Sequence, residues 1–373
     1  MKSKVQSILF AIVILGLSII NIIKPSKAFS SKENRYLDQF PELSFENVLS
    51  GEFSTDFEKY ASDQFILRDN WIGLKTLSQL AILKKDNGRV YFGSDDYLFD
   101  VENGLSEEQF KLNITNLNKF ALALNDDINI TALLVPTKTE VLKDKLPSNA
   151  PVTDETELVE KIKEALYWNI MVTDLIQTFK DHSNESIYYK TDHHWTSKGA
   201  FYAYEKYLNS IGSSPLKESD FIIENVSDEF YGTSYRKANF YLGNPDIITK
   251  YTAKDPVHLE VNYNNLTKAD DLYDNSFLNK TDKYSYFLGG DKALVEINTS
   301  IKNGKTIVVL KDSFANSMVP FLVNSYEQVF VLDTRYFNTS ISGFINERDV
   351  DEVLLLYNIQ TFVNEKSFIK FGM

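Results

Sequence analysis

Continuous apolar runs separated by segments of helical periodicity constrain the fold more than any other feature of this chain. The runs are ITALLVP (130–136), the IVVL near the start of 305–326, and the cores of 328–337 and 351–362. Runs of this length are typical of strands buried on both faces of a sheet. Helices are expected around 153–167 and 197–211. Because strands alternate with helices, the sequence predicts a doubly wound, mostly parallel α/β sheet with helices on both faces.

The segment 213–300 interrupts this alternation. It is polar and rich in Asn and Asp, and its strand-like pieces IITKYTA and VHLEVNY indicate a β-rich insertion or a substrate flap. Upstream, 53–85 has helical spacing and 88–100 has the pattern of a hairpin. We therefore expect three parts. Residues 1–27 are a membrane-spanning segment, residues 28–100 are a tether with a helical region and a hairpin, and residues 101–373 are a large domain that contains the insertion around 213–300.

The N-terminus has the composition of a membrane segment. The nineteen residues from Val5 to Ile23 contain no charge and follow two lysines. As a helix they would span about 28 Å, close to one hydrocarbon thickness. The lysines favour an orientation that leaves the rest of the chain outside the cytoplasm. The length of the run favours a retained anchor in the cell membrane, whereas cleavage near Ala28 would give a secreted protein.

Composition excludes several classes of function. The net charge of −13 argues against binding to nucleic acid. The chain has no cysteine, which excludes disulfides, thiolate metal sites and a cysteine nucleophile.

A serine follows one of the expected strands directly. Ser313, after Asp312, lies where the strand Ile307–Leu310 turns into a helix. Open α/β sheets place their sites at the carboxyl ends of strands. Backbone N–H groups at the start of a helix can stabilise an oxyanion there. The alternative is that Ser313 or Asp312 only caps the helix.

The segment TDHHW holds two of the four histidines. If it is extended, Asp192 and His194 point to one side and His193 to the other. A serine nucleophile needs an imidazole base and a carboxylate that fixes its tautomer, and Asp192 with His194 offers both. Trp195 follows, so a purely structural His–Trp corner is one alternative.

A metal site is the other alternative for this segment, since Asp-His-His also occurs in manganese phosphoesterases. That class needs further clustered ligands, and the remaining histidines, His182 and His258, lie in unrelated polar stretches. We therefore expect no metal.

Asn358 follows the apolar strand Val353–Leu356 and so falls at a carboxyl end as well. Its side-chain amide could donate to an oxyanion. An ordinary turn asparagine is the alternative.

Together these segments resemble the DHHW family, relatives of the SGNH-hydrolase-like alginate O-acetyltransferase proteins of the periplasm. The resemblance covers most of the chain after the apolar N-terminus and is carried by ENRYLDQFP, FEKYASDQFILRDNW, LLVPTKTEVLKDKLP, YYKTDHHWTSKGA, FYGTSYRKA and LKDSFANS. It implies an SGNH-hydrolase-like fold for 101–373 and a triad of Asp192, His194 and Ser313.

Two features depart from classical SGNH enzymes. Lys311 stands where they have glycine, and the Asp-x-His segment precedes the serine. The oxyanion donors cannot be matched by position, so Gly232 and Asn358 are candidates. His193 is expected to orient the site or to contact substrate, and further candidates for substrate binding are Trp195, Tyr235 and Arg236.

The resemblance implies an extracytoplasmic O-acetyltransferase that acts on a polysaccharide through an acyl-serine, without a cofactor. A membrane-bound O-acyltransferase would supply the acetyl group. Two alternatives remain open: an esterase with the same triad, because water can replace the sugar hydroxyl, and a non-catalytic carbohydrate-binding assembly protein.

Overall fold

The computed structural model describes residues 2–30, 35–102, 104–239, 243–264 and 266–372. It divides the chain into two compact units. The first comprises Met1–Asn87 and Tyr235–Leu242, and the second comprises Gly88–Ser234 and Gly243–Met373.

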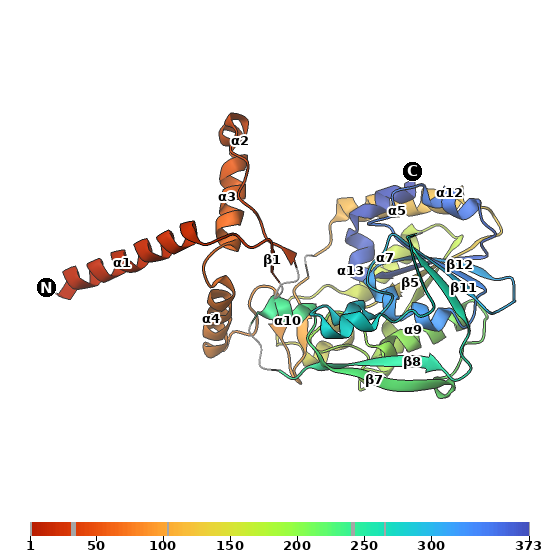
Figure 1. Cartoon of the computed structure of the whole chain (residues 1–373). Helices are drawn as coiled ribbons and strands as arrows, with labels where there is room; N and C mark the ends of the chain where they lie inside the picture. The colour runs from red at the N-terminus through yellow and green to blue at the C-terminus, as the bar shows by residue number, and fades with distance from the viewer. Residues whose placement is uncertain (1, 31–34, 103, 240–242, 265, 373) are drawn as a thin grey trace. The chain divides into compact units, whose positions relative to one another are not determined.

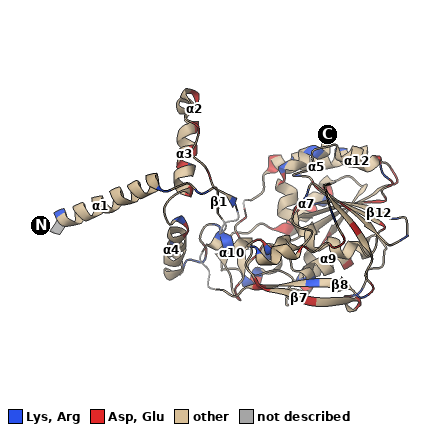
Figure 2. Cartoon of the chain, in the orientation of Figure 1, with Lys and Arg blue, Asp and Glu red and all other residues tan. Residues whose placement is uncertain are grey.

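The first unit is mainly helical. Its elements are α1 (Lys2–Ile23), β1 (Phe29–Ser30), β2 (Arg35–Tyr36), α2 (Phe45–Ser50), α3 (Glu52–Asp63) and α4 (Arg68–Ala81), and α10 (Thr233–Ala238) ends in it. Helix α1 is long and apolar enough to cross a membrane, and its only charged residues, Lys2 and Lys4, lie at its start (Figure 2). The length and composition of α1 fit a membrane anchor or a signal sequence.

The second unit is built on an eight-stranded sheet in the order β10-β9-β11-β13-β12-β14-β5-β6. Figure 1 labels β5, β11 and β12 of this sheet. Its strands are β5 (Asn129–Val135), β6 (Ile170–Asp174), β9 (Leu259–Tyr263), β10 (Thr267–Ala269), β11 (Leu294–Thr299), β12 (Thr306–Lys311), β13 (Gln328–Asp333) and β14 (Glu352–Asn358). The five strands from β13 to β6 are parallel, and β11, β9 and β10 continue the sheet antiparallel. The predicted mostly parallel sheet is confirmed.

Both faces of the sheet are covered, because its central strands alternate between two cores. In β12, Val308 and Leu310 pack into one core, whereas Ile307 and Val309 pack into the other. The first core contains residues of α5 (Glu107–Ala123), α7 (Glu155–Ala165), α12 (Ile341–Asn346), α13 (Ile359–Asn364) and the 3-10 helix η6 (Lys366–Gly372). The second contains residues of α8 (Ile176–Asp181), α9 (Ser197–Ser210), η5 (Ser313–Ser317), α11 (Val319–Leu322), and the hairpins β3 (Val90–Phe92) with β4 (Leu98–Asp100) and β7 (Phe221–Phe230) with β8 (Asp246–Ala253). The predicted doubly wound arrangement is confirmed.

The β-rich character of 213–300 is also confirmed, and its strands have two destinations. Among the described residues, β7 and β8 pair only with each other, whereas β9, β10 and β11 join the central sheet. The short helices η2 (Glu218–Asp220), η3 (Asn275–Asn279) and η4 (Lys283–Tyr286) lie in the same stretch. Since β11 pairs with β13, this stretch covers what would otherwise be an open edge of the parallel sheet.

The parallel register brings the carboxyl ends of several strands to one edge of the sheet. Lys311 of β12 is opposite Leu356 of β14, and Asn358 of β14 is opposite Val135 of β5. Two short helices, α6 (Lys138–Val141) and η1 (Lys143–Lys145), follow β5 at this edge, and η5 follows β12. The sequence segments singled out for their chemistry therefore converge here.

Packing of the C-terminal segment on the sheet is open to a direct test. Phe368 is fully buried, and its ring lies 4.9 Å from that of Tyr357 and 5.1 Å from that of Phe371. We expect Phe368→Ala to lower the free energy of unfolding by about 3–5 kcal/mol, because it leaves a cavity. Ile369→Ala is the control, because Ile369 is half exposed, and its effect should stay within about 0.5 kcal/mol. Denaturant unfolding measures both, and equal effects would contradict this packing.

Candidate active site

Residues 188–195, which contain the DHHW segment, form a tight loop, the DHHW loop, whose two ends are joined by backbone hydrogen bonds. Tyr188 and Trp195 form an antiparallel bridge, and the N–H of Tyr189 donates to the carbonyl of His194 at 3.2 Å. The Thr196 hydroxyl then caps α9 by accepting the N–H of Gly199. The chain between these bonds has to turn back within a few residues.

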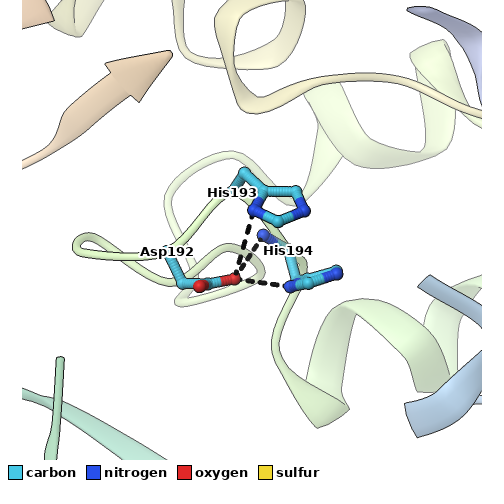
Figure 3. Close-up of side chains that lie close together, drawn as sticks. All are labelled: Asp192, His193 and His194. Atoms are coloured by element: carbon cyan, nitrogen blue, oxygen red, sulfur yellow. Dashed lines mark hydrogen bonds and ion pairs between the residues drawn. The ribbon is translucent and has the colours of Figure 1, made fainter. Parts of the chain in front are cut away.

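Asp192 and His194 meet through a turn, which corrects the expectation of an extended segment. Asp192 Oδ1 accepts the backbone N–H of His194 at 2.9 Å, and its distance to the His194 Nδ1 is 2.5 Å (Figure 3). An aspartate side chain often bonds to the backbone two residues on, and this bond sets the turn. The structure therefore brings the two side chains together through a turn and not through an extended segment.

The imidazole of His194 bridges two distant segments. Its Nε2 lies 2.7 Å from the Ser313 Oγ, at the start of η5. Asp192 and His194 are buried, whereas Ser313 is partly exposed. The structure therefore brings together all three residues of the predicted triad, with the serine at the accessible end.

Asp192 is held as a carboxylate. Its Oδ2 accepts the N–H of Thr233 at 2.6 Å and the Thr233 hydroxyl at 3.1 Å. Burial by itself would raise the pKa of Asp192, but the charges of His194 and His193 and the hydrogen bonds outweigh it, and the pKa lies well below its usual range. An ionised Asp192 accepts hydrogen bonds only, so the Nδ1 of His194 carries the proton and Nε2 can accept one from Ser313.

Gly232 provides space for this carboxylate. A Cβ at position 232 would lie 2.2 Å from the Cβ and from the Oδ2 of Asp192. The N–H of Gly232 donates to the Thr191 hydroxyl at 3.1 Å. This donor is therefore already used, and the structure gives Gly232 a steric role instead of the expected oxyanion role.

Asp312 caps the turn that presents Ser313. Its Oδ1 accepts the N–H of Phe314 at 3.0 Å, and its Oδ2 accepts the N–H of Asn358 at 2.8 Å. Burial raises the pKa of Asp312 to about 6, although these two hydrogen bonds act in the opposite direction. The helix-cap alternative thus holds for Asp312, while the Ser313 hydroxyl faces His194.

Asn358 lies at this edge but caps a different helix. Its Oδ1 accepts the N–H of Gln360 at 3.0 Å, and its Nδ2 donates to the carbonyl of Val135 at 3.0 Å. Among the described residues, no hydrogen bond joins its amide to Ser313. These contacts correspond to the turn alternative for Asn358.

Trp195 is a structural link, which corrects its expected role in substrate binding. Its indole is fully buried, and Nε1 donates to the carbonyl of Phe314 at 3.0 Å and to the Ser317 hydroxyl at 2.8 Å. It therefore fastens the DHHW loop to the turn of Ser313.

The other substrate-binding candidates remain predictions. The side chain of His193 is 34% exposed, and its Nδ1 lies 2.5 Å from the Thr233 hydroxyl. Tyr235 and Arg236 belong to the first unit, in α10.

Sequence reasoning missed Tyr284. Its ring stacks on the imidazole of His194 with a centroid distance of 3.8 Å and an interplanar angle of 4°. Its hydroxyl donates to the Ser313 carbonyl at 3.1 Å. Tyr284 lies in the polar segment 213–300, where no local pattern distinguishes it from the other tyrosines.

The donor set does not fit a metal well. Asp192, His193 and His194 can offer ligand atoms that all lie within 4.8 Å of one another. However, both oxygens of Asp192 and both ring nitrogens of His194 take part in hydrogen bonds to protein groups. A metal would have to break these bonds, so the geometry favours a hydrogen-bonded chain over coordination.

Comparison with known proteins places the chain among related folds. The family model described as "DHHW protein" matches residues 81–332, and no curated protein matches. A DHHW family protein from Eubacterium siraeum is 25% identical, with a TM-score of 0.67 over 77% of this chain and 96% of that one. Bacillus cereus PatB1, solved with a sulfonyl adduct, is 23% identical, with a TM-score of 0.65 over 76% of this chain and 98% of that one.

Glu155 is a further carboxyl group that is buried at the same edge of the sheet. Glu155, the first residue of α7, accepts the N–H of Thr137 at 2.8 Å and the Gln360 Nε2–H at 3.1 Å. Burial raises the pKa of Glu155 to about 8, against the effect of these two bonds. Between about pH 4.5 and pH 8, the folded protein therefore holds a proton on Glu155 that the unfolded chain, in which the pKa of this group is near 4.5, has lost.

This difference makes stability depend on pH. The contribution of Glu155 is fully present below about pH 4.5 and is lost as the pH rises through 8. We expect the free energy of unfolding of the wild type to fall relative to that of Glu155→Gln by up to about 4–5 kcal/mol between these pH values. Urea unfolding at pH 5, 6.5 and 8 measures this. Glu157→Gln, an exposed position on the same helix, is the control, and a pH-independent difference would contradict a protonated Glu155.

Proposed function

Because the chain belongs to the DHHW protein family, we propose that it is an extracytoplasmic O-acetyltransferase that acts on a cell-surface or secreted polysaccharide through an acyl-serine intermediate. The observation that supports this most is the chain of contacts from Asp192 to the His194 Nδ1, at 2.5 Å, and from the His194 Nε2 to the Ser313 Oγ, at 2.7 Å. These are the contacts that an activated serine needs.

In the first half-reaction, the His194 Nε2 removes the Ser313 Oγ proton while Oγ attacks the carbonyl carbon of an acyl donor. The tetrahedral intermediate collapses to acyl-serine, and the imidazolium of His194 returns the proton to the leaving group. Asp192, whose pKa lies far below neutral, stays ionised and stabilises the imidazolium.

The oxyanion needs a donor close to the serine. Ser313 is the first residue of η5, and the N–H of a first helical residue has no partner within its own helix. Since the N–H of Gly232 and the amide of Asn358 are engaged elsewhere, we assign the backbone N–H of Ser313 as the main donor.

In the second half-reaction, His194 takes the proton of a sugar hydroxyl as that oxygen attacks the acyl-serine. As the bond between the acyl carbon and the Ser313 Oγ breaks, the imidazolium of His194 gives this proton to Oγ, so the products are the O-acetylated sugar and free Ser313. If water attacks instead, the same residues release acetate, so exclusion of water decides between transfer and hydrolysis.

The source of the acetyl group follows from the family resemblance. A membrane-bound O-acyltransferase would pass acetyl across the bilayer to this protein, which α1 would hold at the membrane surface unless it is cleaved near Ala28. No cofactor is needed, because each half-reaction only moves an acyl group from one nucleophile to another.

Trapping the serine tests the proposal. The protein is incubated with p-nitrophenyl acetate or with phenylmethylsulfonyl fluoride, which forms a sulfonyl ester with an activated serine, and its intact mass is followed. We expect one adduct on the wild type, none on Ser313→Ala, and formation slowed by about 10²–10⁴-fold in His194→Ala, which lacks the base. His182→Ala is the matched control, because His182 pairs with Glu185 and should not affect the rate.

Adding acetylatable oligosaccharides separates the alternatives. Acetylated sugar indicates transfer, whereas acetate alone indicates an esterase. A wild type that binds glycans but forms no adduct would support the non-catalytic alternative and contradict the proposal.

A further inference from the structure

We propose that Lys138 and Asp246 are positioning residues that clamp the loop 189–194 from two sides and thereby hold Asp192 and His194 in place for Ser313. This assignment rests on the proposed function for its catalytic consequence. The clamp joins three parts of the chain that are far apart in sequence: the end of β5, the DHHW loop and the start of β8.

Lys138 binds the acceptors of the loop. It is the first residue of α6 and only 3% exposed. Its Nζ donates to the carbonyls of Tyr189 at 3.1 Å, Lys190 at 3.2 Å and Asp192 at 2.6 Å. An ammonium group has three N–H donors, so one side chain fixes three carbonyls, including that of Asp192 itself.

Asp246 binds the donors of the same loop. It is the first residue of β8 and is buried. Its Oδ1 accepts the N–H of Lys190 at 2.8 Å, while its Oδ2 accepts the N–H of Thr191 at 2.7 Å and the Thr191 hydroxyl at 2.6 Å. Together with the N–H of Leu98, which also donates to the carbonyl of Lys190 at 2.9 Å, these two buried side chains of opposite charge satisfy the polar backbone of the loop.

The clamp also reaches the second oxygen of Asp192. The Thr191 hydroxyl, held by Asp246, accepts the N–H of Gly232. The next residue, Thr233, donates its N–H to the Asp192 Oδ2. Lys138 thus fixes Asp192 through the backbone carbonyl of that residue. Asp246 fixes the side-chain carboxylate of Asp192 indirectly, through Thr191 and the segment that begins at Gly232.

Neither side chain reaches His194 or Ser313 by a hydrogen bond, so each acts through the loop. Substituting either Lys138 or Asp246 leaves the other charge buried with less electrostatic compensation. Either substitution also removes hydrogen bonds to the loop and should make the loop more mobile. The two substitutions should therefore be non-additive.

The test compares full-length wild type, Lys138→Met, Asp246→Asn and the double variant in detergent, with two readouts. The first is the rate of Ser313 labelling by phenylmethylsulfonyl fluoride, resolved into reagent affinity and maximal rate. We expect each single variant to lower the maximal rate by about 10–100-fold with unchanged affinity, and the double variant to be no slower than the worse single variant.

The second readout is hydrogen exchange followed by mass spectrometry. Exchange of the peptide covering 188–196 should accelerate by about tenfold or more in both single variants, while the β12 peptide stays protected. Glu352→Gln is the control: Glu352 is a buried carboxylate bonded to Tyr207 and Tyr326 at the opposite end of the sheet, and its loss should lower Tm without changing labelling or loop exchange.

The outcomes are distinguishable. Unchanged loop exchange in both single variants would overturn the clamp, whatever the labelling shows. Faster loop exchange with wild-type labelling rates would overturn the positioning role. A wild type that is never labelled counts against the proposed function, and the exchange measurement still decides the clamp.

Discussion

The hydrogen bond between the His194 Nε2 and the Ser313 Oγ is the contact on which the site depends, because it joins segments 119 residues apart. Each partner is fixed by its own surroundings. The sheet fixes Ser313, since β12 ends beside β14 and Asp312 anchors the following turn to Asn358. His194 lies in a loop that accepts a backbone hydrogen bond from a strand, since the N–H of Leu98 in β4 donates to the carbonyl of Lys190 at 2.9 Å. Side chains hold the loop further: Trp195 fastens it to the turn of Ser313, and Tyr284 covers the imidazole. The 2.7 Å distance between the His194 Nε2 and the Ser313 Oγ thus depends on the edge of the sheet, which positions the serine, and on the contacts that hold the loop of the histidine.

Burying this many polar groups is costly, and the structure offsets the cost with closely matched charges. Lys311, two residues before Ser313, shows how. Its ammonium is fully buried and lies 2.6 Å from Asp291 and 3.3 Å from Asp333. Burial alone would raise the pKa of Asp291, but Lys311 and Arg335 hold it well below its usual range. Asp291 lies three residues before β11, so the buried lysine two residues before Ser313 is balanced by a carboxylate from the insertion.

The features that could be predicted from the sequence are those with a local signature. The apolar runs predicted the parallel strands. Ser313 was a candidate for the triad because it directly follows one of these runs, and Asp192 and His194 were candidates because of their spacing in the Asp-x-His segment. The oxyanion candidates Gly232 and Asn358 show the limit of this reasoning. Whether an amide is available depends on its acceptors, Thr191 and Val135, which only the folded chain brings near. Tyr284 and Asp246 were missed for the same reason, because a polar segment carries no periodic pattern that could assign them to a site.

The insertion 213–300 is better described as a wall of the site than as a flap. Asp246, Tyr284 and Asp291 come from it, and they contact the DHHW loop, the imidazole of His194 and Lys311, respectively. A flap that opens freely would need few contacts with the site that it covers. Here β9, β10 and β11 are hydrogen-bonded into the central sheet, so the segment that carries Tyr284 and Asp291 is fastened next to β11. Lifting this segment would separate the ring of Tyr284 from the imidazole of His194. In the proposed reaction, an acyl donor and a sugar would therefore reach the site from the partly exposed side of Ser313 and His193.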